Sequence, residues 1–213
     1  MPTRLLGLLA MTMSLPALLA AQVFAAALCN EPVPAPTFTV GEKWTWRDER
    51  GAETTTEVIQ VEGGITQMKE DTGDVTFYDQ DGVVQKVRKK NGEVVARPGV
   101  GAYAAIGQKT MDFPLHIGKQ WQWSYRGIPD NLGYVLTYYQ RYEVVACEAV
   151  TTAAGRFSAL KIRVVQHAGG IAGSGTYYFW YAPRVKVSVK RQYVLSPYWS
   201  KTRDSELVKY DLK

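Results

Sequence analysis

Apolar and polar residues alternate with a period of two along most of the chain after residue 36. Over 157–167 the aliphatic residues share one face, and two basic residues share the other face with a histidine (Leu160, Ile162 and Val164 against Lys161, Arg163 and His167). A strand with one apolar and one polar face is typical of an antiparallel sheet packed on one side. No segment keeps a 3.6-residue apolar period over three turns. The pattern therefore predicts an all-β protein.

Turn dipeptides divide these alternating segments into hairpins. Gly63-Gly64, Asp81-Gly82 and Asn91-Gly92 each lie between β-rich segments, which is typical of two-residue hairpin turns. Residues 98–111 (PGVGAYAAIGQKTM) interrupt the pattern and separate two halves, about 38–97 and 113–213. The expected strands are 44–48, 54–61, 65–69, 75–78, 83–88 and 93–96 in the first half, and 121–125, 134–147, 157–167, 176–181, 184–194 and 205–210 in the second.

These segments predict one domain over residues 38–213. We expect a curved antiparallel sheet or an incomplete β-barrel, built from two meander halves and with little helix. The strand over 134–147 is long enough that it should bend or bulge.

A seven-residue motif occurs once in each half. VGEKWTW at 40–46 is echoed by IGKQWQW at 117–123. In a strand, side chains two residues apart lie on the same face, so each copy should place its two indoles side by side. We interpret the motif as a sign that the two halves are related. Chance similarity of a short motif is the alternative.

The first 27 residues predict a secretory signal peptide. Arg4 is the only charge, an apolar stretch follows, and small residues at 25–27 suit cleavage after Ala27 or Ala25. Two alternatives stay open. One is a retained membrane anchor, because residues 5–28 are uncharged and long enough to span a bilayer. The other is a lipoprotein modified at Cys29, although Leu28 and Ala26 before it stand in the wrong order for that signal. After cleavage the protein would be periplasmic or secreted.

A Pro-rich leader, residues 28–37, follows the signal, and with it comes the first of two cysteines. Export to an oxidising compartment favours a disulfide between Cys29 and Cys147, although two unpaired thiols are the alternative. A bridge closing a loop of this length contributes about 4–5 kcal/mol in the chain-entropy model. The mature chain holds 24 basic and 20 acidic residues, a net charge of +4. The basic residues are dispersed, so we expect no nucleic-acid binding.

Few residues could carry catalysis. His116 and His167 are the only imidazoles, and neither belongs to a cluster with the spacing of metal ligands. Ser196 and Ser200 lack the context of a nucleophile elbow. Acidic pairs at 48–49 and 70–71 stand beside turns, where such residues are ordinarily solvated. We expect no catalytic residues, no metal and no cofactor, and hence no enzyme; an unrecognised hydrolase is the alternative.

Aromatic residues are abundant, with six Trp and 13 Tyr. A concave sheet face lined by them could hold an acyl chain or stack on sugars, and packing of a β core is the alternative. The candidate ligand-lining residues are Trp44, Trp46, Trp121, Trp123, Tyr178 and Trp180. A basic stripe could meet anionic lipid or glycan, or simply protect a sheet edge from aggregation. This stripe consists of Lys161, Arg163, Arg184, Lys186 and Lys190.

Three motifs in the second half resemble a known group of families. FPL at 113–115 leads to a Gly-Lys-x-Trp motif at 118–121, followed by AGRFSALKI at 154–162 and YFWYAPRV at 178–185. Over residues 113–194 the chain resembles the TapB-like families of bacterial exported β-rich proteins, which are domains of unknown function. The resemblance implies an exported β-rich fold and no agreed activity.

Together these observations predict a non-enzymatic envelope protein. We expect it to bind an apolar or amphipathic ligand, or a partner, on a concave aromatic face. A structural or assembly factor of the cell envelope without a small ligand is the alternative. The expected partners are lipid, glycan or another envelope protein, with no integral membrane segment after cleavage.

Overall fold

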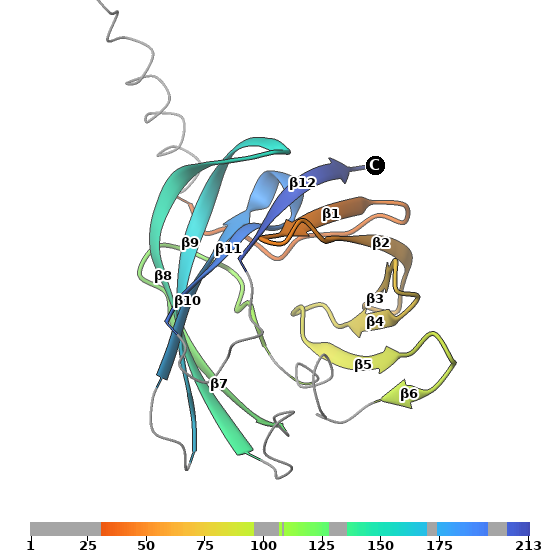
Figure 1. The fold of residues 1–213 in the computed structure, drawn as a ribbon, viewed down its shortest axis with the longest axis horizontal. Helices are drawn as coiled ribbons and strands as arrows, with labels where there is room; N and C mark the ends of the chain where they lie inside the picture. Colours follow the sequence, from red (N-terminus) through yellow and green to blue (C-terminus); the bar gives the residue numbers. More distant parts are fainter. Residues whose placement is uncertain (1–30, 96–106, 108, 128–135, 170–173, 196–203) are drawn as a thin grey trace, which may run out of the picture.

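The computed structural model describes residues 31–95, 107, 109–127, 136–169, 174–195 and 204–213. Its strands form a 12-stranded sheet in the order β6-β5-β4-β3-β2-β1-β12-β11-β10-β9-β8-β7 (Figure 1). The strands are β1 Lys43–Asp48, β2 Glu53–Glu62, β3 Ile65–Glu70, β4 Val75–Tyr78, β5 Val84–Arg88, β6 Val94–Val95, β7 Gln120–Gly127, β8 Leu136–Thr152, β9 Gly155–Ala168, β10 Ser174–Ala182, β11 Val187–Leu195 and β12 Ser205–Asp211. Neighbouring strands are antiparallel throughout, and the sheet curves without closing, so the predicted fold class is confirmed.

The two predicted meanders are present as β1–β6 and β7–β12. Within each, strands adjacent in the sequence are adjacent in the sheet. The halves join where the first strand of one meets the last strand of the other. In this pair, Lys43 lies opposite Asp211 and Asp48 lies opposite Ser205. The two edges of the sheet are therefore β6 and β7, which are consecutive in the sequence.

Turn chemistry fixes the hairpins where the sequence predicted them. Gly63 and Gly64 connect β2 to β3 with φ values of 56° and 77°, a left-handed conformation that glycine adopts without a steric cost. The start of β11 differs from the prediction. Residues Pro183–Val185 form a 3-10 turn, Lys186 follows at φ 66°, and the strand begins at Val187 rather than at residue 184. Pro183 provides no N–H for a sheet ladder, and this favours a turn at that point.

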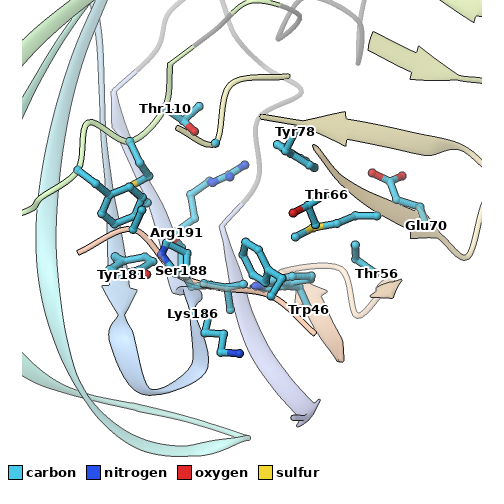
Figure 2. Close-up of a pocket in the computed structure, with 18 of the residues that line it drawn as sticks. Trp46, Thr56, Thr66, Glu70, Tyr78, Thr110, Tyr181, Lys186, Ser188 and Arg191 are labelled. Atoms are coloured by element: carbon cyan, nitrogen blue, oxygen red, sulfur yellow. The ribbon is translucent and has the colours of Figure 1, made fainter. Parts of the chain in front are cut away.

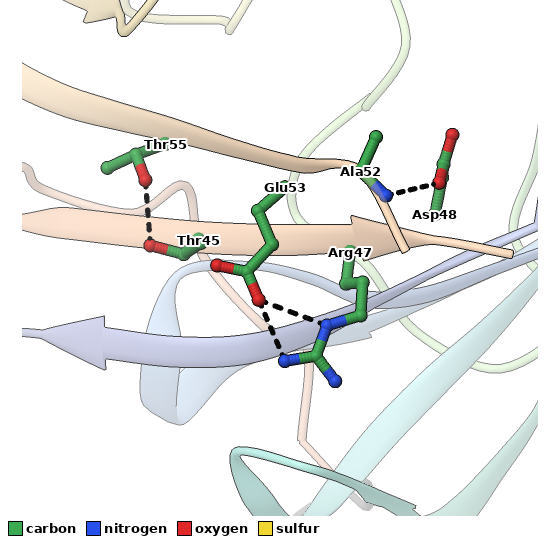
Figure 3. A network of polar contacts seen from close by, with 6 residues as sticks. All are labelled: Thr45, Arg47, Asp48, Ala52, Glu53 and Thr55. Carbon is green, nitrogen blue, oxygen red and sulfur yellow. Dashed lines mark hydrogen bonds and ion pairs between the residues drawn. The ribbon is translucent and has the colours of Figure 1, made fainter. Parts of the chain in front are cut away.

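The outward face of β1 and β2 is polar, as one-sided packing requires. Figure 3 shows the hydroxyls of Thr45 and Thr55 hydrogen-bonded at 2.9 Å, and the Arg47 guanidinium donating to Glu53 at 2.7 and 3.0 Å. At the turn between the strands, the Asp48 carboxylate accepts the backbone N–H of Ala52 at 2.9 Å.

Two apolar clusters form most of the core. The first covers β7–β10 and includes Tyr142 and Ile162, with Val33 and Leu115 packed over them. Val33 and Leu115 exchange backbone hydrogen bonds of 2.7 and 2.8 Å, so part of the predicted leader crosses the sheet and belongs to the core.

The second cluster surrounds the buried Trp44. The long β8–β9 hairpin curves toward β12 (Figure 1) and contributes Phe157 to this cluster. The curve coincides with a register shift in β8 between Val144 and Ala146, where a bend or bulge was predicted. At the hairpin tip, the N–H of Ala154 donates to the carbonyl of Leu207 at 3.2 Å.

Candidate ligand-binding site

A cavity of about 850 Å³ opens on the inner face of the sheet beside the first half (Figure 2). Strands β1–β4 form one side of it, and β11 with the preceding turn forms another. Residues 35–38 and 110–113 cross the sheet and complete the walls. The site thus combines both halves with two segments outside the sheet.

Aromatic and thioether side chains make one part of the wall apolar. Trp46 is fixed in place because its indole N–H donates to the carbonyl of Ser188 at 2.9 Å. Phe113 and Tyr181 meet edge to face, with ring centroids 5.5 Å apart. The large aromatic and thioether residues of this part of the lining are Phe38, Trp46, Met68, Met111, Phe113 and Tyr181.

The opposite wall is polar because β2 and β3 direct hydroxyl-bearing residues inward. Thr56 and Thr66 line the cavity, with Glu70 and Tyr78 beyond them (Figure 2). Burial raises the pKa of Glu70 above its ordinary value, and the neighbouring carboxylate of Asp74 adds to the shift. Burial, reinforced by the nearby charge of Glu70, raises the pKa of Tyr78 to about 12. The Tyr78 hydroxyl is therefore a hydrogen-bond donor at neutral pH.

Arg191 is the cation that extends into the cavity. Its side chain points toward Tyr78 (Figure 2), and its charge partly opposes the rise in the pKa of Tyr78. Arg191 forms no ion pair or side-chain hydrogen bond with any residue in the described part of the chain. Among the described residues the Arg191 guanidinium thus has no charge partner, and it shares the cavity with the aromatic and thioether part of the wall.

The first copy of the repeated motif holds the turn that precedes β11. The buried Glu42 carboxylate accepts from the Lys186 ammonium at 2.5 Å. The indole N–H of Trp44 donates to the carbonyl of Val185 at 2.8 Å, next to the bond from Trp46. Three side chains of the first half thus position the cavity wall that the second half supplies. The motif was predicted, but its contact with this turn was not.

The second copy has the same backbone and a different role. Gly118 donates to Val144 as Gly41 donates to Val58, both at 2.8 Å. Trp121 stacks on Tyr142 with centroids 4.9 Å apart, inside the first core cluster. The indole nitrogens of Trp121 and Trp123 are buried without a hydrogen-bond partner in the described structure. This copy packs a core and lies away from the cavity.

The structure divides the six predicted ligand-lining residues between the two core clusters. Trp121 and Trp123 belong to or pack against the first cluster, and the other four (Trp44, Trp46, Tyr178 and Trp180) belong to or pack against the second. Of the six, Trp46 lines the cavity. Trp180 is buried and donates its indole N–H to Glu148 at 2.6 Å.

Sequence reasoning missed Arg191, Met68 and Tyr181. Alternation along β10 groups Phe179 with Tyr181 and separates them from Tyr178 and Trp180, so the signal was present. Alternation alone does not indicate which face of β10 lines the cavity.

The predicted basic stripe is largely paired with acidic groups. Lys161 lies 3.5 Å from Glu148, and Arg163 forms an ion pair with Glu143. Lys161 and Lys190 also lie over the ring of Trp180, at 5.0 and 5.3 Å from its centroid. These contacts leave little free positive charge on the part of the stripe formed by β9 and β11.

The remaining candidate residues form no reactive cluster. His116 lies near the carbonyl of Ile117 at 3.1 Å, and His167 stacks on Tyr139. In the described ranges, no group of three or more His, Cys, Asp or Glu side chains could hold a metal ion. Ser196 and Ser200, the signal peptide over residues 1–27 and Cys29 lie outside the described residues, so the Cys29–Cys147 bridge stays a prediction. No helix among the described segments has the length and apolar character needed to cross a membrane.

Comparisons with known proteins give likenesses of fold only. No family model matches the chain, and no curated protein matches it significantly. Among solved structures, the hypothetical lipoprotein YmcC of Escherichia coli K12 is similar with a TM-score of 0.49 and 11% identity, over 95% of this chain and 99% of that chain. A candidate lipoprotein from Parabacteroides distasonis has a TM-score of 0.41 and 14% identity, over 85% of this chain and 100% of that chain. A candidate exported protein with a YmcC-like fold from Bacteroides fragilis has a TM-score of 0.39 and 16% identity, over the same shares.

Likeness at these TM-scores and identities assigns neither a family nor a function to this chain. The resemblance to the TapB-like families therefore stays a prediction.

Proposed function

We propose that the protein is an exported binding protein that holds an amphipathic small molecule in the cavity beside β1–β4. The observation that carries this proposal is the cavity itself. Its volume, about 850 Å³, lies within the range of roughly 300–1,000 Å³ that is typical of small-molecule sites. Export is supported by the signal peptide that the sequence predicts over residues 1–27.

The distribution of groups around the cavity favours an amphipathic ligand over a sugar or a metal. Phe38, Trp46 and Met68 offer a continuous apolar surface, whereas Arg191 and Tyr78 place polar groups on one side. Sugar binding usually combines an aromatic platform with many paired polar groups. Here the aromatic and thioether side chains form one part of the wall, and Arg191 with Tyr78 offers a polar group beside it, an arrangement that suits one polar head and one apolar tail.

The first test is native mass spectrometry of the protein extracted gently from its own envelope. We expect a co-purifying amphiphile, seen as a mass increment that is lost under denaturing conditions. Calorimetric titration of the stripped protein with a panel of dodecyl amphiphiles then measures affinity. A bare protein that binds none of the panel would contradict the proposal and favour the structural or assembly role.

A cavity-filling variant localises the binding. Thr56→Trp adds an indole inside the cavity and should weaken binding at least about tenfold. Thr55→Trp adds the same indole one residue away, on the outward face of β2. Equal affinity of the two variants would place the ligand elsewhere.

A further inference from the structure

We propose that the ligand carries an acidic head group and that Arg191 is the residue that binds it. This inference rests on the proposed function and adds the chemical class of the ligand. The position of Arg191 in the sheet is its first support. In β11 it lies opposite Phe179 of β10 and Ser205 of β12. Directly opposed residues share a face, so Arg191 lies on the face where Phe179 packs into the core.

Most other charges around the cavity already have partners. Lys186 is paired with the buried Glu42, and Lys190 lies over the ring of Trp180. The Asp48 carboxylate accepts two backbone N–H groups of its turn, each at 2.9 Å, and the Asp79 carboxylate accepts two more, at 3.0 and 2.8 Å. Of the three cavity-lining cations, Arg191 is the one that makes no ion pair, side-chain hydrogen bond or ring contact with a described residue.

The chemistry of the guanidinium group indicates what would balance it. Its planar fork of N–H donors matches the two oxygens of a carboxylate or phosphate, which it binds in bidentate fashion. Tyr78 stands on the side toward which Arg191 points and keeps its hydroxyl proton at neutral pH, so it can donate a further hydrogen bond. Both groups therefore favour an oxyanion.

The polar wall that includes Glu70 and Tyr78 does not favour a cationic head group. Glu70 is the acidic group there, and burial disfavours its charged form. The Glu70 carboxylate accepts a hydrogen bond from the Thr72 hydroxyl at 3.4 Å, and this bond opposes the rise in its pKa. A cation would meet the positive charge of Arg191, and the other two carboxylates of the lining, Asp48 and Asp79, already accept backbone N–H groups. An acid can place its head group at Arg191 and its tail along Met68 and Trp46.

The test compares four amphiphiles with the same tail in calorimetric titrations of the mature protein. Dodecanoate and dodecyl phosphate carry acidic heads, dodecyl maltoside is neutral, and dodecyltrimethylammonium is cationic. We expect either acid to bind at least about tenfold more tightly than the ammonium compound. The ratio between the two acids distinguishes a carboxylate ligand from a phosphate ligand.

Variants assign the preference to Arg191. Arg191→Gln should weaken binding of the acids about 10- to 100-fold and leave dodecyl maltoside unchanged, which also shows that the variant is folded. Arg191→Lys keeps the charge without the bidentate fork and should give an intermediate loss. Arg184→Gln is the matched control, because Arg184 is exposed on the 3-10 turn and does not line the cavity.

The outcomes separate the two proposals. If all four amphiphiles bind alike and Arg191→Gln has no effect, the protein binds amphiphiles but the acidic head group is wrong. A preference for the ammonium compound would overturn the inference in the same way. If none of the four binds, the proposed function fails and this inference falls with it.

Discussion

The motif at 40–46 and its echo at 117–123 have the same backbone and stabilise different parts of the molecule. In each, a glycine with a positive φ, 92° at Gly41 and 85° at Gly118, donates to the neighbouring strand. The next residue is Glu42 in one copy and Lys119 in the other. The indoles of the first copy donate to Val185 in the turn before β11 and to Ser188 in β11, whereas those of the second copy find no acceptor in the described structure.

This difference shows how one local structure serves two purposes. The second copy fills a core, with Trp121 against Tyr142. The first copy connects the halves through polar contacts, and the cavity lies beside that connection. The residue after the glycine pairs with Lys186 in the first copy, where it is Glu42, and with Asp112 in the second copy, where it is Lys119.

The largest loss of stability is expected at the first of two ion pairs, Lys186–Glu42 and Lys119–Asp112, when the lysine of each is removed. Lys186→Met leaves the fully buried Glu42 without its cation, and removing one partner of a buried pair costs about 3–5 kcal/mol of unfolding free energy. Lys119→Met should cost only about 1 kcal/mol or less, because Asp112 is partly exposed and keeps its contact with Lys109 at 2.6 Å. Urea unfolding measures both.

A second substitution checks the cause of that loss. Adding Glu42→Gln to Lys186→Met removes the unbalanced charge and should recover much of the stability. Equal losses for the two Lys→Met variants would mean that the copies do not differ in this way.

The next largest loss of stability concerns Trp44 and Trp121, which occupy equivalent positions in the two copies. Trp44→Phe removes the donor to Val185, and Trp121→Phe removes a buried N–H that has no partner. Both changes lose the same volume, so their difference isolates the hydrogen bond. We expect Trp44→Phe to be more destabilising by about 1–3 kcal/mol in thermal or urea unfolding. A larger loss at Trp121 would show that stacking on Tyr142 outweighs the hydrogen bond.

The smallest loss of stability is expected at the positive-φ glycine that both copies of the motif share. Gly41→Ala and Gly118→Ala each force a side chain into a left-handed backbone conformation, at a cost of about 1–2 kcal/mol. A Cβ at Gly118 would meet nothing within 4 Å, and one at Gly41 would meet only the Lys213 side chain at 3.5 Å. The two losses should therefore agree within about 0.5 kcal/mol. Tolerance of Ala at only one of them would contradict a common backbone.

Local signals in the sequence were sufficient to predict the positions of the strands, but they were insufficient to predict which residues line the cavity. Alternation and turn dipeptides predicted all twelve strands because both depend on neighbouring residues. The 3-10 turn at 183–185 was missed because its alternating sequence continues into β11. The cavity depends on which face curves inward and on residues 35–38 and 110–113 crossing it. These relations join distant parts of the chain, and no local pattern encodes them.

The pairing of β1 with β12 has a consequence for how the protein folds. The seam in the middle of the sheet unites residues 43–48 with residues 205–211, so it can form only after nearly all of the chain has emerged. Contacts of such sequence separation are slow to form, because the loop between them must close first. In the sheet, β12 lies between β1 and β11, so β1 and β11 are brought together only when β12 pairs with both. The cavity, which needs both β1–β4 and the turn before β11, is therefore among the last features to be completed, and a ligand can be captured there only after the two halves have joined.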